Sequence, residues 1–372
     1  MGIYSSKEGD MRGLSKKLFI IFLVLFIFLL SGCKKEEVTE EIEPIEEVGA
    51  EEVVEEEIEI VEEEAEPVEE EVEEEKILSK LSGSESTEED KLKRVLAVML
   101  DNHPRARMHA GINNADMVFE MKVEGTYTRL LALFQSQEAD RIGPIRSSRP
   151  YFIDRMYEFN SIYGHVGGSV EATERLYDKK YDNVNGMVVS SKYMWRDSST
   201  GKKAPHNMYS SSKALRDYGL DKGYEEEYDF RGYLFNQEPI EIGGEESKSI
   251  KVEFARDNIS IFTFDEDDNK YFYNKDGKDQ VDENTGDPIK ARNIIVQYVN
   301  YKPLPRDGSL WLIDQVGEGK GLYFSMGQVV EISWEKKDES SQTLYYIDGE
   351  EISLNPGQTW ILLGDKNTKV SY

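Results

Sequence analysis

The sequence predicts an α+β domain over residues 91–240 with a mixed central sheet, followed by a mostly antiparallel, all-β domain over residues 248–372. An α/β arrangement of the first domain is the alternative. Three observations predict this architecture. Apolar runs of strand length alternate with helix-period segments as far as about residue 218. From residue 249 only strand-length runs remain, and turn clusters separate them. The chain of 372 residues is also long enough for two domains.

The first domain opens with short apolar runs that are typical of buried strands. Strands are expected over residues 95–100, 116–121, 128–134, 161–165 and 186–190. Gly125 and Thr126 lie between the second and third of these runs, so a hairpin is expected there. Helices are expected from Pro150, over residues 170–179 and over residues 210–218, with a long polar loop over residues 195–207.

The second domain shows strand patterns throughout. Strands are expected over residues 250–255, 259–264, 270–273, 294–299, 311–314, 321–325, 329–334, 343–347 and 359–363. Turn-forming clusters such as Asn274–Gly277 and Asn355–Gly357 separate several of them.

Residues 1–33 have the features of an export signal. A basic segment precedes the unbroken thirteen-residue apolar run Leu18–Leu30, which is short of the ~20 residues a spanning helix needs. The run ends in Leu30-Ser31-Gly32-Cys33, which resembles a bacterial lipoprotein signal whose cysteine becomes the lipidated N-terminus. We therefore expect a protein anchored to the cell membrane through Cys33 and facing the extracytoplasmic side.

Residues 34–90 are expected to form a disordered, Glu-rich tether. Residues 36–75 hold 23 of the 74 acidic residues and no Lys or Arg, so most of the net charge of −29 lies there. Such a composition cannot bury enough apolar surface to offset its ordering entropy. A spacer is the expected role, and a calcium- or polycation-binding tail is the alternative. The acidic balance of the remainder indicates no nucleic-acid partner.

The residue types give little support to a metal or a cofactor. Cys33 is the single cysteine, so neither an intrachain disulfide nor a cysteine-based metal site is expected. His103 and His109 do not have ligand spacing. The glycines near residue 167 do not form a nucleotide-binding motif. No cofactor and no metal are therefore expected.

An arginine-rich stretch, residues 141–154, carries the main functional hypothesis. Pro150 suits the first position of a helix, and Ser148 suits its N-cap. Arg146 and Arg149 would then flank a helix N-terminus, where backbone N–H groups favour an anion. The alternative is that the two arginines pair internally, with carboxylates at residues 101, 124 or 154.

Further polar residues are expected near this helix start. Asp101 and His165 each close an apolar strand, and ligands gather at the carboxyl ends of strands in open sheets. Histidine is the residue type most often used for acid–base work, so His165 and His206 are the candidates for that role. The candidate ligand-binding residues are Asp101, Glu124, Arg129, Arg146, Ser148, Arg149, His165, Arg196 and His206.

Several segments together resemble a known family. They are Ala97–Asn102, Val123–Gly125 with Thr128-Arg129, Gly143–Pro150, His165–Ser169, Ala204–Asn207, Gly317–Gly321, Trp334–Lys336 and Asn355–Ile361. Over residues 91–372 they are similar to the YerB-like bacterial lipoproteins, the two-part DUF3048 family of unknown function. Ser148 departs from the small residue, such as Ala, that the resemblance leads us to expect. The resemblance implies an exported lipoprotein with two domains, and it supplies neither a reaction nor a ligand.

Two classes of function remain. The first is a surface-anchored binding or accessory protein for an anionic component of the cell envelope, and the residues favour it because arginines outnumber any catalytic set. The second is an envelope hydrolase that uses His165 or His206 as acid or base. Gly167-Gly-Ser169-Val-Glu171 misses the nucleophile-elbow motif at its last position, which weakens covalent serine catalysis.

Overall fold

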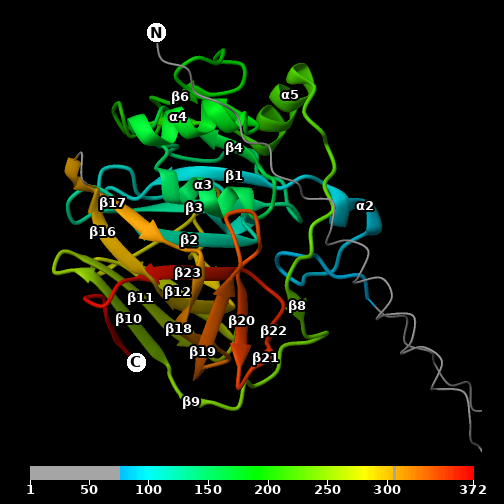
Figure 1. The fold of residues 1–372 in the computed structure, drawn as a ribbon, viewed down its shortest axis with the longest axis vertical. Helices are drawn as coiled ribbons and strands as arrows, with labels where there is room; N and C mark the ends of the chain where they lie inside the picture. The colour runs from blue at the N-terminus through cyan, green and yellow to red at the C-terminus, as the bar shows by residue number, and fades with distance from the viewer. Residues whose placement is uncertain (1–75, 305–306) are drawn as a thin grey trace, which may run out of the picture. The chain divides into compact units, whose positions relative to one another are not determined.

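The structure is a computed structural model that describes residues 76–304 and 307–372 (Figure 1). The described residues all belong to one compact unit. Cys33 and the Glu-rich segment as far as residue 75 lie outside the described residues. Within the described part of the chain, no helix is both long enough and apolar enough to cross a membrane.

The first half of the described chain mixes helices and strands (Figure 1). Its helices are α2 (Glu88–Leu92), the 3₁₀ helix η1 (Ile112–Asn114), α3 (Pro150–Tyr157), α4 (Val170–Lys179) and α5 (Ser212–Lys222). Its strands are β1 (Leu96–Asp101), β2 (Met117–Lys122), β3 (Thr128–Phe134), β4 (Ile162–His165), β5 (Asn183–Asn185), β6 (Trp195–Arg196), β7 (Met208–Tyr209) and β8 (Leu234–Phe235).

The second half consists of strands and their connections. They are β9 (Glu245–Glu246), β10 (Ser249–Ala255), β11 (Asn258–Asp265), β12 (Lys270–Lys275), β13 (Lys278–Asp279), β14 (Lys290–Ala291), β15 (Asn293–Tyr298), β16 (Asn300–Leu304), β17 (Asp307–Asp314), β18 (Gly317–Ser325), β19 (Gln328–Lys336), β20 (Leu344–Ile347), β21 (Glu350–Glu351), β22 (Ser353–Leu354), β23 (Thr359–Gly364) and β24 (Lys369–Ser371).

A mixed sheet of twelve strands runs through both halves. Its order is β21-β20-β19-β18-β15-β23-β2-β3-β1-β4-β5, with β9 paired to β19. β1 is antiparallel to β3 and parallel to β4, whereas β23 is parallel to both β2 and β15. The mixed central sheet and the antiparallel hairpins of the second half agree with the prediction. Because β23 comes from the end of the chain, it joins the two halves into one sheet.

Both faces of the twelve-stranded sheet are covered. One face packs against the second sheet, β13-β12-β11-β10-β24 with β14, and against Leu215 of α5. The other face packs against α3, α4 and Ile313 of β17. Every residue of β1, β2, β3 and β23 is therefore buried. Burial on both faces explains why these strands read as continuous apolar runs rather than as alternating ones.

One strand prediction is wrong. Residues 186–190 form a turn, and the strand lies just before them as β5. The Asn185 side-chain oxygen accepts hydrogen bonds from the backbone N–H of Met187 and of Gly167, which closes the turn. Met187 and Val188 are mostly exposed, so their apolar character does not report burial in a strand.

The predicted tether extends too far toward the C-terminus. Residues 76–90 are described, and they are packed: Leu81 is fully buried, and the Gly357 N–H donates to the Ser82 carbonyl at 2.7 Å. Leu78 pairs with Glu85 in an isolated bridge, and the Thr87 side chain caps α2. The expected disorder therefore cannot hold for residues 76–90, whereas residues 34–75 lie outside the described part.

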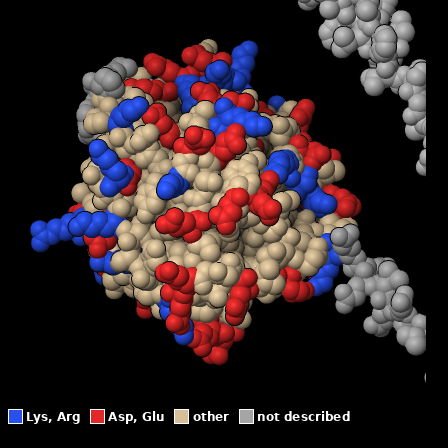
Figure 2. All heavy atoms as spheres, turned by 60° about the horizontal axis from the view of Figure 1, so that its bottom comes forward, with Lys and Arg blue, Asp and Glu red and all other residues tan. Residues whose placement is uncertain are grey.

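Charged side chains are mixed on the surface. On the face that Figure 2 displays, Lys and Arg stand beside Asp and Glu rather than in one continuous field. A site for a charged ligand must therefore be sought where cations locally exceed their carboxylate partners.

Candidate functional site

The end of β1 is where the predicted residues meet. The Asp101 N–H donates to the Pro144 carbonyl at 2.8 Å, and the Arg146 N–H donates to the Met99 carbonyl at 2.9 Å. The Val166 N–H donates to the Arg146 carbonyl at 3.0 Å. The arginine-rich stretch is thereby attached along the ends of β1 and β4, so Arg146 lies beside Asp101.

Asp101 is the centre of a small polar cluster. Its buried carboxylate places Oδ2 2.7 Å from His206 Nδ1 and 3.3 Å from Arg146 Nε, and Oδ1 accepts from the His103 N–H at 3.1 Å. The Arg146 contact lacks hydrogen-bond geometry, so it is an ion pair by proximity alone. We name Asp101, His103, Arg146 and His206 the His–Asp cluster.

The two histidines of the His–Asp cluster stack on each other. Their ring centroids are 4.6 Å apart with an interplanar angle of 18°, and the Tyr127 ring centroid is 4.8 Å from that of His103. Burial lowers the pKa of His103, and repulsion from His206 lowers it further. His103 is therefore neutral near pH 7 when nothing else occupies the cluster.

The hydrogen bond between Asp101 and His206 determines which tautomer the neutral His206 ring adopts. A carboxylate only accepts, so the proton of the neutral imidazole lies on Nδ1. Nε2 is then an unprotonated acceptor. An oriented imidazole of this kind can take a proton from a ligand or bind an anion once it is protonated.

Glu124 forms ion pairs with both Arg129 and Arg149. Arg129 donates from Nη2 to Glu124 at 3.3 Å and from Nη1 to the Ser147 carbonyl at 2.6 Å. Arg149 forms an ion pair with the same carboxylate and donates from Nη1 to the Ser148 carbonyl at 2.7 Å. Burial lowers the pKa of Arg129 to about 10 and also lowers that of Arg149. Arg149 thus has an internal carboxylate partner, as the alternative interpretation expected, and so does Arg146 through Asp101.

Ser148 does not cap α3. The N-cap residue is Arg149, which makes no side-chain capping bond, although Pro150 does occupy the first turn as predicted. The buried Ser148 hydroxyl accepts from the Tyr163 hydroxyl at 2.8 Å instead. The prediction failed because Tyr163, fifteen residues further on, competes for this oxygen through the tertiary fold.

His165 lies at the end of β4, beside the end of β1, but its ring nitrogens contact partners other than Asp101. Its Nδ1 is 2.8 Å from the Gly167 carbonyl, and its Nε2 is 3.2 Å from Asn183 Oδ1 in β5. Burial lowers its pKa, and both ring nitrogens are engaged. Ser169 is also occupied, because its side chain caps α4. This geometry gives no support to a catalytic pair of Ser169 with His165.

Arg196 lies at the margin of the cluster. It is exposed in β6, and its Nη1 donates to the Asn207 side chain at 2.9 Å, next to His206 in the sequence. The structure therefore brings Asp101, Arg146, His206 and Arg196 into one neighbourhood. Glu124 pairs with Arg129 and Arg149 beside it, and Arg129 lies opposite Asp101 and interacts with its charge.

The predicted set omits His103 and Tyr127. The spacing Asp101-x-His103 after a strand was the available signal, because a residue two places beyond a strand end remains close to it. Among the described residues, no group of three or more His, Cys, Asp or Glu side chains is placed to hold a metal ion.

Two buried ionic networks were also missed. Lys275 of β12 and Glu120 of β2 form an ion pair at 2.6 Å with neither side chain exposed, and Ser260 and Thr128 donate to the same carboxylate. The second network centres on Arg155, which is fully buried and pairs with Glu158 at 2.9 Å. Single charged residues inside apolar runs gave no indication of these partners.

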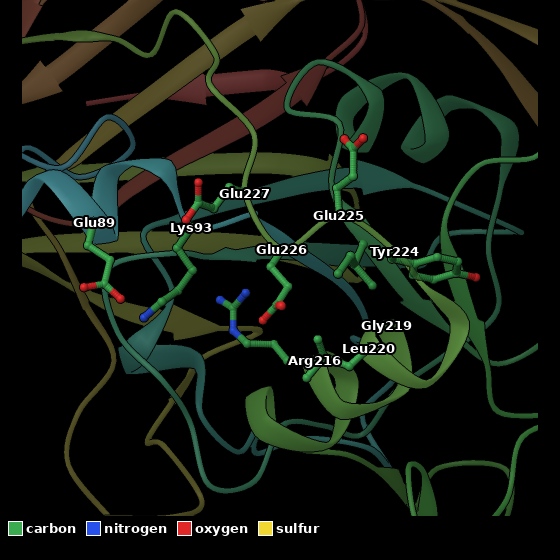
Figure 3. A pocket seen from close by; sticks show the side chains of 10 residues that line it. Glu89, Lys93, Arg216, Gly219, Leu220, Tyr224, Glu225, Glu226 and Glu227 are labelled. Atoms are coloured by element: carbon green, nitrogen blue, oxygen red, sulfur yellow. The ribbon is translucent and has the colours of Figure 1, made fainter.

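A hollow beside α5 contains none of the predicted site residues. It measures about 140 Å³ and is lined partly by Ile162, Leu220 and Tyr224. Figure 3 shows the Arg216 guanidinium between the Lys93 amine and the Glu226 carboxylate. Arg216 also pairs with Glu138 at 2.9 Å. The positive charge of Arg216 in this hollow is thus offset by carboxylates of the protein itself.

The fold and these clusters define a two-part, strand-rich protein whose halves share one sheet. A family model described as "Protein of unknown function (DUF3048) N-terminal domain" matches residues 81–225, and the DUF3048 C-terminal domain matches residues 250–361. The chain belongs to the DUF3048 family, so the family prediction is confirmed.

The chain is similar to a Bacillus subtilis protein whose crystal structure is known. The chain is 32% identical over 289 residues, 77% of its own length and 86% of the relative's, to a protein of Bacillus subtilis (strain 168) named "Putative lipoprotein YerB". The crystal structure of YerB from Bacillus subtilis matches with a TM-score of 0.73 at 30% identity, covering 80% of this chain and 100% of that chain.

Proposed function

We propose that this protein is a lipid-anchored binding or accessory protein of the bacterial envelope, and that its His–Asp cluster binds an anionic envelope component. The lipoprotein name of the YerB relative supports the anchor, as does the predicted lipidation signal ending at Cys33. The ligand would carry a carboxylate or phosphate group, such as those of wall glycopeptides.

One observation carries the binding part of the proposal. Arg146 and two stacked imidazoles meet around a single carboxylate, Asp101, and the Arg146 side chain is 27% exposed. An anion next to the rings would favour their protonated forms and would offset the added charge. Binding should therefore be stronger at pH 5.5 than at pH 8.

Calorimetry on residues 34–372 tests this proposal with acetate, inorganic phosphate and soluble muropeptides as probes. Wild type should bind one of them more tightly at the lower pH, and Arg146→Gln should weaken that binding at least tenfold. Arg231→Gln is the matched control, because the Arg231 side chain is 47% exposed and pairs with Glu351 of β21, the edge strand furthest from β4 and β5 in the sheet order. Equal binding by wild type and Arg146→Gln would overturn the proposal.

The second function, an envelope hydrolase, is favoured by the bond between Asp101 and His206. This bond orients Nε2 as a general base. Incubation of wild type and His206→Gln with muropeptides, followed by assays for new amines and reducing ends, separates the two functions. Turnover by wild type that His206→Gln abolishes would establish the hydrolase; binding without turnover supports the accessory protein.

The anchor is tested at Cys33. Cys33→Ala should either block signal processing or release the protein from membranes, because the thiol is the site of lipid attachment. Membrane fractionation of the two forms measures this. A Cys33→Ala protein that is processed and stays membrane-bound like wild type would contradict it.

A further inference from the structure

A second polar pocket lies at the other end of the strands from the His–Asp cluster. Asp101 is opposite Arg129 at one end of the β1–β3 pair, whereas Leu96 is opposite Phe134 at the other end. The pocket, about 440 Å³ in volume, lies beyond that second end. Its polar lining includes Ser82, Ser84, Ser136, Lys270, Lys290 and Arg292.

Three cations of the pocket come from the second half of the chain. Lys290 pairs with Asp268. Arg292 donates from Nη1 to the Asn269 carbonyl and from Nε to the Pro356 carbonyl at 3.3 Å, so its partners are neutral. Among the described residues, no carboxylate lies within 4 Å of the Lys270 amine or the Arg292 guanidinium.

The pKa of Lys270 responds to the neighbouring cations. Burial lowers the pKa of Lys270, and repulsion from Arg292 lowers it further, with a smaller contribution from Lys290. Asp268 acts in the opposite direction. Burial also lowers the pKa of Arg292. Two cations are thus partly desolvated and close together without a dedicated counter-charge.

The acidic residues of the pocket do not supply that counter-charge. Asp116 is buried, and its carboxylate already accepts from the Gln135 N–H at 2.6 Å, from the Ser136 N–H at 3.0 Å and from the Ser136 hydroxyl. Burial raises its pKa. Asp287 is exposed at the edge of the pocket. Asp268 offsets Lys270 and Arg292 only in part, because it pairs with Lys290, so an external anion would complete the offset.

One part of the pocket lining, the serine wall, consists of hydroxyl groups. The Ser82 and Ser84 hydroxyls lie 2.6 Å apart, and Ser136 is 3.5 Å from Ser82. Hydroxyls both donate and accept, so they suit the polar body of a ligand whose anionic group is on the cationic side. The pocket volume also exceeds what a bare ion fills.

We propose that this pocket binds a small phosphate monoester of a hydroxylated molecule, with the phosphate on Lys270 and Arg292 and the hydroxyls against the serine wall. Arginine donates to phosphate in a forked geometry, and lysine adds a mobile charge. This site is separate from the His–Asp cluster and does not rest on the function proposed for it.

Titration calorimetry of residues 34–372 with glycerol 3-phosphate tests the site, with inorganic phosphate and glycerol as partial probes. Glycerol 3-phosphate should bind, inorganic phosphate should bind more weakly, and glycerol should not bind. Lys270→Gln and Arg292→Gln should each weaken glycerol 3-phosphate binding at least tenfold. Lys278→Gln, an exposed substitution in β13 of the same sheet, is the matched control and should bind like wild type.

Arg146→Gln separates the two proposed sites, since it should leave glycerol 3-phosphate binding unchanged. Thermal unfolding without ligand checks that each variant folds. If Arg292→Gln does not fold, Lys270→Gln alone is sufficient for the test. Absence of binding at millimolar ligand, or equal affinity in wild type and Lys270→Gln, would overturn the proposal. Loss of binding in Arg146→Gln instead would place the phosphate at the His–Asp cluster and would also overturn it.

Discussion

Asp101 and Asn102 are neighbours in the sequence, but their side chains lie in two different polar environments. Asp101 faces the His–Asp cluster, whereas the Asn102 side chain donates to Glu120 at 3.2 Å within the Glu120–Lys275 network. Successive side chains of an extended chain point to opposite faces of a sheet. The end of β1 therefore separates a region between the two sheets from a region on the helical face.

The two regions differ in how completely their charges are satisfied. In the Glu120–Lys275 network one ammonium meets one carboxylate with no exposure, and hydroxyls and Asn258 fill the remaining contacts. In the His–Asp cluster, Asp101 faces Arg146 and two imidazoles, and part of Arg146 is exposed. A closed network stabilises the fold, whereas a partly exposed guanidinium beside two imidazoles is available to a ligand.

The largest expected effect is in the closed network. Lys275→Met leaves the Glu120 carboxylate buried without its charge partner, so the free energy of unfolding should fall by about 3–5 kcal/mol. Urea unfolding measures it. Adding Glu120→Gln to Lys275→Met should restore a large part of the loss, since the uncompensated charge is gone. A loss below about 1 kcal/mol in the single variant would mean that the network does not stabilise the fold.

Acid should weaken the fold through a third kind of site, the fully buried His109. Burial lowers its pKa to about 3, with smaller contributions from Lys202 and Arg107, while the unfolded chain takes up a proton near pH 6.5. The unfolded state binds more protons between these values, so stability falls as pH drops below 6.5. The expected loss is about 2 kcal/mol at pH 5.

The measurement is the slope of the unfolding free energy between pH 7 and pH 5. His109→Gln should make this slope shallower by the equivalent of about one bound proton, and this holds whatever the stability of the variant at pH 7. His165, whose pKa burial also lowers, should retain its own contribution in that variant. An unchanged slope would show that His109 does not remain neutral in the fold.

The sequence predicts the long elements of this fold well, and the reason is burial. β1, β2 and β3 are recognisable because both of their faces are buried, and α4 because Ser169 caps it as part of a local pattern. The two- and three-residue strands such as β6 and β8 are too short for any periodicity to appear.

The site is harder to predict, because its contacts span the chain. Asp101 and His206 are 105 residues apart, and Lys275 and Glu120 are 155 apart. Chemistry identified Asp101, Arg146 and His206 as candidates, but a single sequence does not reveal which carboxylate each arginine meets. Arg146 and Arg149 therefore looked equivalent, although Glu124 engages only Arg149.

The difference between these two arginines can be measured directly. Arg149 is buried against Glu124, so Arg149→Gln should lower the free energy of unfolding by about 1.5 kcal/mol. The loss should be smaller than for Lys275→Met, because Glu124 is partly exposed and keeps Arg129. Urea unfolding at pH 7 provides the comparison, and a loss as large as that of Lys275→Met would place Glu124 among the closed networks.

The smallest expected effect is that of Arg146→Gln, which should cost less than about 1 kcal/mol. Asp101 keeps its bonds to His206 and to the His103 N–H when the guanidinium is removed, so no buried carboxylate is left unpaired. The guanidinium is partly exposed and makes no well-formed hydrogen bond to Asp101, so little stabilisation is lost. In the same variant, the anionic probe should no longer raise the melting temperature. If Arg146→Gln instead destabilises the protein more than Arg149→Gln does, Arg146 is a structural partner of Asp101. The available guanidinium that supports ligand binding at the His–Asp cluster would then not exist.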